Sequence, residues 1–329
     1  MNTSEQHRIR IFNDQLQQNI RLTWMDTPDH RSHLFKDFCA SLNLLAPKIR
    51  TVRETEDTAH IPGLQVSYRI RYQMLPSGHH LPVFLDALSM TNGQKIPALS
   101  PDVAALLDQI SLPVALTLYI AEHCPFCPSV VQSLIPVAAA SPLVELTVID
   151  AGLFEELAQN DHVQSVPTLI LDEQFRWTGA VRVPEVLDAI IHRDPSRLQA
   201  DTLMHMLADG RAGMVSDMMM NRNMIFPALL ELLVHPRWSV RLGAMVAVET
   251  LAAEKPELAS QLPELLWPYF DMADDRVRGD ILYTIGEVDT GDSTERLRVI
   301  SKENHDPEVR EAAEEALLKL GERGSIQQS

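Results

Sequence analysis

The sequence predicts an α/β region followed by an all-α region, and three observations support this division. Short runs of β-branched and apolar residues alternate with helix-type segments up to Pro195. Beyond Pro195 the apolar residues recur almost throughout with helical spacing. The length of 329 residues exceeds the usual size of one domain, so two or three domains are expected.

The charge and the lengths of the apolar runs exclude several classes of protein. The formal net charge is −17, and no cluster of Lys and Arg suited to a nucleic-acid backbone is present. This acidity fits simple solubility, and any functional role would favour a partner with a basic patch. We find no secretory signal and no apolar run long enough for a membrane span, so a cytoplasmic protein is expected. Structural disulfides are rare in the cytoplasm, so a Cys-x-x-Cys pair there is typical of catalysis or metal binding.

The segment that contains Cys124 and Cys127 alternates strands with helices. Each strand is a short apolar run, and each helix has apolar residues on one side. A turn glycine, Gly179, follows the last strand. The expected strands are 112–120, 143–150 and 166–173, and the expected helices are 129–140, 154–160 and 183–193.

The preceding hundred residues repeat this order. A strand (19–25), a helix (33–45) and a strand (48–54) are expected there. "IPGLQV" (61–66) parallels "VPTLIL" (166–171), and "LPVFLDAL" (81–88) parallels "VPEVLDAI" (183–190); a glycine, Gly78 or Gly179, precedes each member of the second pair. We therefore expect an N-terminal arm and two copies of one fold, with the Cys-x-x-Cys only in the second; the first copy has the loop "MDTPDHR" in its place. The expected boundaries are 1–14, 15–108 and 109–195.

Residues 196–329 carry a different repeat. Val-Arg pairs occur at 240–241, 277–278 and 309–310, each near the start of an amphipathic helix. Helix pairs that repeat in this way stack into a solenoid, and the pattern resembles short HEAT repeats. The repeated arginines are expected to tie one repeat to the next, with partner binding as the alternative.

The cysteine pair predicts thiol–disulfide chemistry. Cys124 is expected at the junction between a strand and a helix, with Pro125 in the first helical turn, where no N–H partner is needed. The unpaired amides and the helix dipole would lower the pKa of the Cys124 thiol and make it the nucleophile. Cys127, one turn later and partly shielded, is the expected resolving thiol.

Val166-Pro167-Thr168 is expected to form the substrate groove. A proline that opens a strand after a Cys-x-x-Cys pair suggests a cis-proline that faces the cysteines. The backbone of Val166 would then pair with an extended substrate, and Pro125 and Phe126 would contact it from between the cysteines. The alternative is an ordinary edge-strand proline.

These motifs resemble known redox families. Residues 109–192 resemble a thioredoxin-fold domain with a CPFC site close to the glutaredoxin type. Residues 15–195, through "PSGHHLPVFLDAL", "EHCPFCPSVVQSL", "TVIDAGLF" and "VPTLIL", resemble the N-terminal domain of the alkyl hydroperoxide reductase flavoprotein subunit. In that domain, a tandem of two thioredoxin folds, only the second fold keeps its redox cysteines. The resemblance implies that Cys124 and Cys127 carry electrons from a flavin-linked dithiol towards a peroxidase.

The sequence departs from that family at two places. It has a helical region where the flavoprotein has nucleotide-binding domains, and no G-x-G-x-x-G motif. No bound cofactor is therefore expected beyond the Cys124–Cys127 redox disulfide, and electrons would come from an external flavin-dependent reductase. His80 stands where the family has a glutamate associated with proton transfer. It either takes that role, since imidazole titrates near neutrality, or is an exposed loop residue without one.

The function predicted from the sequence is a thiol–disulfide oxidoreductase that reduces a protein disulfide or a peroxidase, with the helical region docking a protein partner. The chemical alternative is a metal site, half of a zinc site or an iron–sulfur cluster shared across a dimer, although no second Cys-x-x-Cys is present. The alternative from another class is an interaction scaffold whose cysteine pair is a redox switch. Cys39, in an apolar helix-type segment, is expected to pack in the core.

Overall fold

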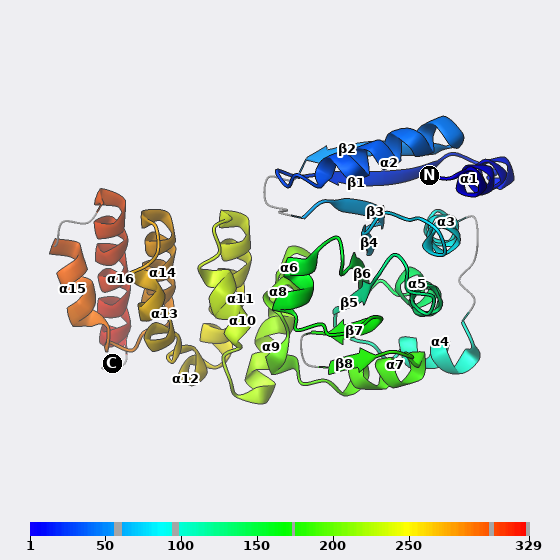
Figure 1. Cartoon of the computed structure of the whole chain (residues 1–329). Helices are drawn as coiled ribbons and strands as arrows, with labels where there is room; N and C mark the ends of the chain where they lie inside the picture. Colours follow the sequence, from blue (N-terminus) through cyan, green and yellow to red (C-terminus); the bar gives the residue numbers. More distant parts are fainter. Residues whose placement is uncertain (56–60, 94–98, 173–174, 303–305, 327–329) are drawn as a thin grey trace. The chain divides into compact units, whose positions relative to one another are not determined.

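A computed structural model describes residues 1–55, 61–93, 99–172, 175–302 and 306–326. The chain divides into two compact units, Met1–Arg193 and Asp194–Ser329 (Figure 1). The first unit contains every strand of the described residues, and the second is built from helices.

The first unit is organised by one eight-stranded sheet with the order β2-β1-β3-β4-β6-β5-β7-β8. Its inward-facing residues are mostly β-branched, leucine or aromatic, which suits a pleated surface packed against helices. The strands are β1 (Ile20–Asp26), β2 (Ile49–Thr55), β3 (Gly63–Ser67), β4 (Ile70–Gln73), β5 (Val114–Ile120), β6 (Val144–Asp150), β7 (Thr168–Leu171) and β8 (Phe175–Thr178).

The two halves of this sheet have the same strand arrangement. In the first half β1 pairs parallel with β2 and antiparallel with β3, which pairs antiparallel with β4. In the second half β5 pairs parallel with β6 and antiparallel with β7, which pairs antiparallel with β8. A parallel pairing of β4 with β6, in which Ile70 lies opposite Leu146, joins the halves. One hydrogen-bonded sheet therefore runs through the whole unit.

Helices cover this sheet and complete one core. Figure 1 shows α3 and α5 on one side of the sheet and α6 on the other. The core is continuous from Ile9 to Ile190 and includes Cys39, which is 2% exposed, where core packing was expected. The helices of this unit are α1 (Thr3–Gln15), α2 (Ser32–Leu45), α3 (His80–Thr91), α4 (Pro101–Leu107), α5 (Cys127–Ala140), α6 (Glu155–Asn160) and α7 (Val183–His192).

The structure differs from the sequence-based expectation at three elements. Residues 1–14, expected to be an arm, contain α1, whose Ile9 is completely buried. An Asn2–Glu5 capping box starts that helix. The strands β4 and β8 were not predicted, because each has only four residues and owes its conformation to pairing with a neighbouring strand.

The second unit is a succession of helices joined by short turns. Asn223, in the left-handed conformation, ends α9 in the manner typical of helix C-termini. The elements are a 3₁₀ turn, η1 (Pro195–Arg197), and the helices α8 (Ala200–Ala208), α9 (Ala212–Arg222), α10 (Pro227–Leu233), α11 (Trp238–Glu254), α12 (Pro256–Ala259), α13 (Leu262–Phe270), α14 (Asp275–Val288), α15 (Thr294–Lys302) and α16 (Pro307–Ile326).

The repeated Val-Arg pairs lie near the starts of α11, α14 and α16. The valines Val240, Val277 and Val309 are all buried. Arg241 on α11 pairs with Asp280 on α14 (Nε–Oδ2 2.5 Å) and also donates to the carbonyls of His235 and Pro236. This arginine therefore joins two repeats, as expected.

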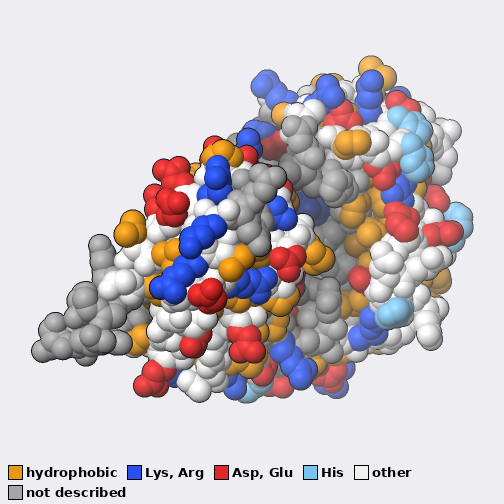
Figure 2. Space-filling view, turned by 90° about the vertical axis from the view of Figure 1, so that its left-hand side faces the viewer, with side chains coloured by type: hydrophobic (Ala, Val, Ile, Leu, Met, Phe, Trp, Pro, Cys, Tyr) orange, Lys and Arg blue, Asp and Glu red, His pale blue; other side chains and the backbone are white. Residues whose placement is uncertain are grey.

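The distribution of charge contains no single basic surface on the face that Figure 2 presents. Lys and Arg side chains lie there among Asp and Glu side chains. None of the helices in the described part of the chain is long and apolar enough to cross a bilayer.

Candidate redox site

The cysteine pair lies in the turn between β5 and α5, where it forms a disulfide. The Cα atoms of Cys124 and Cys127 are 5.5 Å apart. The expected start of the helix was wrong: α5 begins at Cys127, and Pro125 precedes it. A helix that began at Cys124 would require an N–H from Pro128, whereas the observed start places Pro128 in the first turn, where no N–H partner is needed.

The two sulfur atoms have different environments. The backbone N–H of Cys127, the first amide of α5, donates to Sγ of Cys124 at 3.2 Å. Cys124 is partly exposed, whereas Cys127 is completely buried. An amide at a helix N-terminus stabilises negative charge, so this contact would favour a thiolate at Cys124 after reduction.

The Val166–Pro167 segment lies opposite the disulfide. The Val166–Pro167 peptide is cis, and the Val166 carbonyl oxygen is 3.9 Å from Sγ of Cys124. The N–H of Gly179 donates to the Pro167 carbonyl (2.8 Å), and Gly179 has the positive φ (+83°) that favours glycine. The Thr168 hydroxyl donates to the Ser165 carbonyl at 2.7 Å, so its hydrogen bond shapes the loop before β7.

The two residues between the cysteines are both exposed. Pro125 is open to solvent, and the Phe126 side chain is 72% exposed. A large apolar ring beside a partly exposed sulfur is suited to contact with a visiting polypeptide. The structure therefore places Pro125, Phe126 and Val166 around Cys124, whereas Thr168 lies inside the protein.

His80 is buried, so the alternative of an exposed loop residue was wrong. It is the first residue of α3 and is 2% exposed. Its Nε2 lies 3.2 Å from the Ala121 carbonyl oxygen, which also accepts from the N–H of Cys124 at 3.1 Å. Burial lowers the pKa of His80, and the hydrogen bond to Ala121 only partly opposes this. A neutral imidazole that donates through Nε2 therefore holds the turn that carries Cys124.

Further contacts support the same turn, and sequence reasoning missed them. The Ser77 hydroxyl donates to Oε1 of Glu122 at 2.9 Å. The N–H of Gly78 donates to Oε1 of Glu5 at 2.7 Å, which links α1 to the same loop. The capping box at Asn2–Glu5 was a local signal for α1, but no local signal indicated that Glu5 reaches residue 78.

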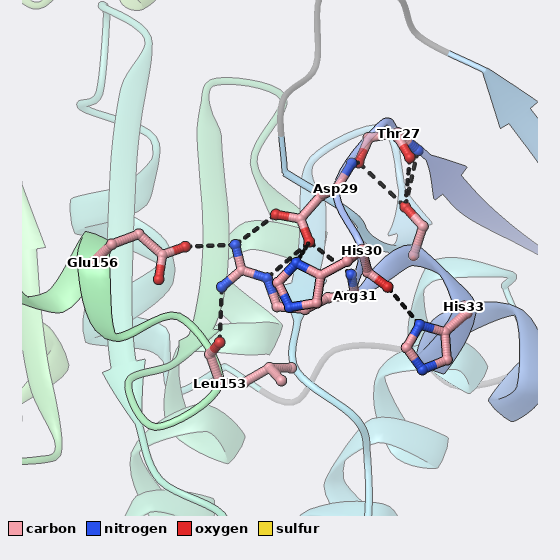
Figure 3. Close-up of polar contacts among 8 residues, drawn as sticks. Thr27, Asp29, His30, Arg31, His33, Leu153 and Glu156 are labelled. Carbon is pink, nitrogen blue, oxygen red and sulfur yellow. Dashed lines mark hydrogen bonds and ion pairs between the residues drawn. The ribbon is translucent and has the colours of Figure 1, made fainter.

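The first half of the sheet has a non-redox counterpart of this site. Ser32 opens α2 as Cys127 opens α5, and Asp29 precedes Ser32 by three residues, as Cys124 precedes Cys127. The Ser32 hydroxyl donates to the Thr27 carbonyl at 2.9 Å and accepts from the Thr27 N–H at 3.0 Å (Figure 3). Hydrogen bonds thus replace thiol chemistry in the loop that corresponds to the redox turn.

Arg31 connects this loop to the second half. Figure 3 shows its guanidinium between Asp29 and the start of α6. It donates to Asp29, to the Leu153 carbonyl (2.8 Å) and to Glu156 (2.5 Å), and it lies 4.2 Å from the centre of the Phe154 ring. The counterpart of the redox turn thus holds the two halves together.

The chemistry of the site depends on its sulfur atoms. Within the ranges that the structure describes, no group of three or more His, Cys, Asp and Glu side chains is placed to hold a metal ion. A strand, a turn with two cysteines, a helix that begins at the second cysteine, and a cis-proline loop opposite together define a thioredoxin-type disulfide site.

Known proteins share this fold. A protein-family model described as a thioredoxin domain matches residues 115–192. Alkyl hydroperoxide reductase AhpF from Pseudomonas aeruginosa is 28% identical over 153 residues, which are 45% of this chain and 29% of that protein. The Pseudomonas putida protein of the same name is 27% identical over 129 residues, 39% of this chain and 24% of the relative. The matches thus span about a quarter of the length of these relatives.

Two solved structures extend the likeness to most of the first unit. A domain of alkylhydroperoxide reductase AhpF from Enterococcus faecalis aligns with a TM-score of 0.50 and 21% identity, covering 58% of this chain and 99% of that chain. A protein disulfide oxidoreductase from Aeropyrum pernix K1 aligns with a TM-score of 0.52 and 12% identity, covering 60% of this chain and 95% of that chain. The expected thioredoxin fold and the similarity to the N-terminal domain of the flavoprotein subunit are therefore confirmed.

Proposed function

We propose that this protein is a thiol–disulfide oxidoreductase in which Cys124 is the nucleophile and Cys127 the resolving thiol. One observation carries the proposal: the first amide of α5 points at the partly exposed Cys124 sulfur, while Cys127 is buried behind it. The similarity to alkyl hydroperoxide reductase AhpF and to a protein disulfide oxidoreductase supports the reaction class.

The cycle uses two exchanges. The Cys124 thiolate attacks one sulfur of a substrate disulfide, forms a mixed disulfide and releases the first substrate thiolate. The Cys127 thiolate then attacks Sγ of Cys124 and releases the second. Two electrons pass to the substrate, and the Cys124–Cys127 disulfide remains. Val166, Pro125 and Phe126 would contact the substrate polypeptide, and His80 would position the turn through Ala121 or accept a proton at Nδ1.

The proposed organisation is a tandem of two thioredoxin-like folds, 15–108 and 109–195, followed by a HEAT-like domain, 196–329. The matching strand orders of the two halves support the tandem, and the recurring Val-Arg helices support the solenoid. A flavin-dependent reductase would supply electrons, because the sequence has no nucleotide-binding motif, and the acceptor would be a protein disulfide or a peroxidase. The HEAT-like domain would dock a protein partner, and the expected setting remains the cytoplasm.

Substitution of the cysteines tests the chemistry. Cys124→Ser is expected to abolish insulin-disulfide reduction by dithiothreitol-reduced protein, and Cys127→Ser is expected to accumulate a mixed disulfide. Cys39→Ser is the matched control, because Cys39 is buried in the core and should leave the activity unchanged. Unchanged insulin reduction by Cys124→Ser would refute the assignment.

Alkylation of the reduced protein tests which thiol is activated. At mildly acidic pH the label is expected on Cys124. Burial raises the pKa of Cys39 to about 12, so this thiol serves as an internal control that stays unlabelled. Preferential labelling of Cys127, or of neither redox cysteine, would contradict the proposed roles.

A redox-switched scaffold is the second candidate, favoured by the exposed apolar residues of α11 in the second unit. Turnover separates the two. A catalyst reduces insulin repeatedly when a flavin-dependent reductase and its reductant are supplied, whereas a switch is reduced once and stops.

A further inference from the structure

The helices α11, α14 and α16 share one partly apolar and partly acidic face. Equivalent positions follow from their Val-Arg pairs, because residues two and six positions after each valine lie on one side of its helix. The face, named here the α11–α14–α16 face, consists of Leu242, Val246, Gly279, Tyr283, Glu311 and Glu315.

The α11 part of this face is an exposed apolar stripe. Trp238, Leu242 and Val246 follow one another at intervals of four residues and are 59%, 40% and 42% exposed. The opposite side of the same helix is already packed, since Ala244 and Val248 are almost completely buried. Apolar residues on both sides of a helix are typical of one side in the core and the other against a partner.

The α14 part forms an open floor next to this stripe. A Cβ atom added at Gly279 would meet nothing within 4 Å, so the surface is hollow at that turn. One turn later the Tyr283 hydroxyl donates to Oε1 of Glu249 on α11 at 2.8 Å. Tyr283 also lines a shallow pocket with Ala312 and Glu315 of α16, so its ring connects all three helices.

The α16 part supplies negative charge. Glu311 and Glu315 are exposed on the first turns of that helix. The ammonium group of Lys319, on the same side, pairs with Glu287 and lies 4.2 Å from the centre of the Tyr283 ring. This lysine is therefore engaged within the unit, and the face presents apolar side chains at α11 and carboxylates at α16.

We propose that this face binds a basic amphipathic helix of a partner protein. Its apolar residues, three or four apart, would cover Trp238, Leu242 and Val246, and its Lys and Arg would approach Glu311 and Glu315. A second copy of this chain is a poor occupant, because each copy has a net charge of −17. The inference rests on the proposed docking role of residues 196–329, and it names the surface and the chemistry of the partner.

Fluorescence anisotropy with the full chain and a labelled helical peptide of leucine and lysine, with leucines three and four apart, tests this face. Val246→Glu is expected to weaken binding by about tenfold or more, because one anchor is lost and a charge is buried. Val299→Glu is the matched control: Val299 is also 42% exposed but lies on α15, outside the face, so affinity should change by less than about twofold. Glu315→Lys should weaken binding and reduce its salt dependence, whereas Glu295→Lys on α15 should do neither.

Several results would overturn the proposal: no binding by the unmodified chain, equal loss in the Val246 and Val299 variants, or equal binding of a leucine–glutamate peptide. Sedimentation that shows a dimer of the unmodified chain, lost in Val246→Glu, would assign the face to a second copy instead. Unfolding midpoints within error of the unmodified protein are required of each variant. Insulin reduction is measured on the same samples and should be unchanged, so failure of the redox function and failure of this proposal are separable.

Discussion

Arg31→Ala is expected to weaken the connection between the two halves of the redox unit. The Arg31 side chain is 13% exposed, while Asp29 is 12% and Glu156 is 53% exposed. Loss of a charge-assisted hydrogen bond to the Leu153 carbonyl corresponds to about 1.5–3 kcal/mol. The contact with the buried Phe154 ring adds about 1 kcal/mol, and the solvent-exposed Glu156 pair adds less than about 1 kcal/mol. Because such terms are not additive, the expected loss in free energy of unfolding is about 2–4 kcal/mol.

Urea unfolding measures this loss when only the first unit reports. The chain has four tryptophans, so replacing Trp238 and Trp267 by phenylalanine leaves Trp24 and Trp177 of the first unit as the fluorescent probes. Arg182→Ala is the matched control, since Arg182 is 75% exposed and pairs only with half-exposed Glu185 at 2.8 Å; its cost should stay below about 0.5 kcal/mol. Arg31→Lys should lie between, because an ammonium cannot reproduce the guanidinium geometry.

The pH dependence gives a second reading of the same contact. The hydrogen bond from Arg31 is the largest cause that lowers the pKa of Asp29 below its ordinary value of 3.8. A carboxyl with a lowered pKa stabilises the folded state above 3.8, and that contribution is lost as the pH falls through its folded pKa. The difference between the unmodified protein and Arg31→Ala should therefore narrow below about pH 4. A loss of stability no greater than that of Arg182→Ala would refute the role of Arg31 in joining the halves.

Two further predictions concern buried ionisable groups. Because burial lowers the pKa of His80 below 6.5, the unfolded chain takes up a proton before the folded chain does; stability should fall as the pH drops below 6.5, and His80→Gln should flatten that profile in urea titrations. The same slope in both proteins would contradict this reasoning. Arg193→Met should cost about 3–5 kcal/mol, because Asp172, 3% exposed and 2.8 Å from the guanidinium, loses its partner. Adding Asp172→Asn should restore most of the stability, since asparagine tolerates the φ of 44° there, and a double variant as unstable as the single one would count against the pair.

Local sequence signals located the chemistry of this protein well. The Cys-x-x-Cys pair, the proline at the start of β7 and the Gly179 turn each depend on backbone and side-chain properties of a few neighbouring residues. The amphipathic helices of the second unit were also readable, because helical periodicity is a local property. Errors arose where local signals were short or competed: four-residue β4 and β8 were missed, and Pro128 rather than Pro125 occupies the first turn of α5.

The sequence by itself determined which residues can exchange electrons and where the strands and helices of the redox segment lie. Tertiary structure alone decided that β4 pairs with β6, that Arg31 reaches the Leu153 carbonyl 122 residues away, and that His80 lies against Ala121. The physical reason is that a strand edge, a guanidinium or an imidazole can satisfy its hydrogen bonds with many partners. Only the packing of the whole core selects one of them.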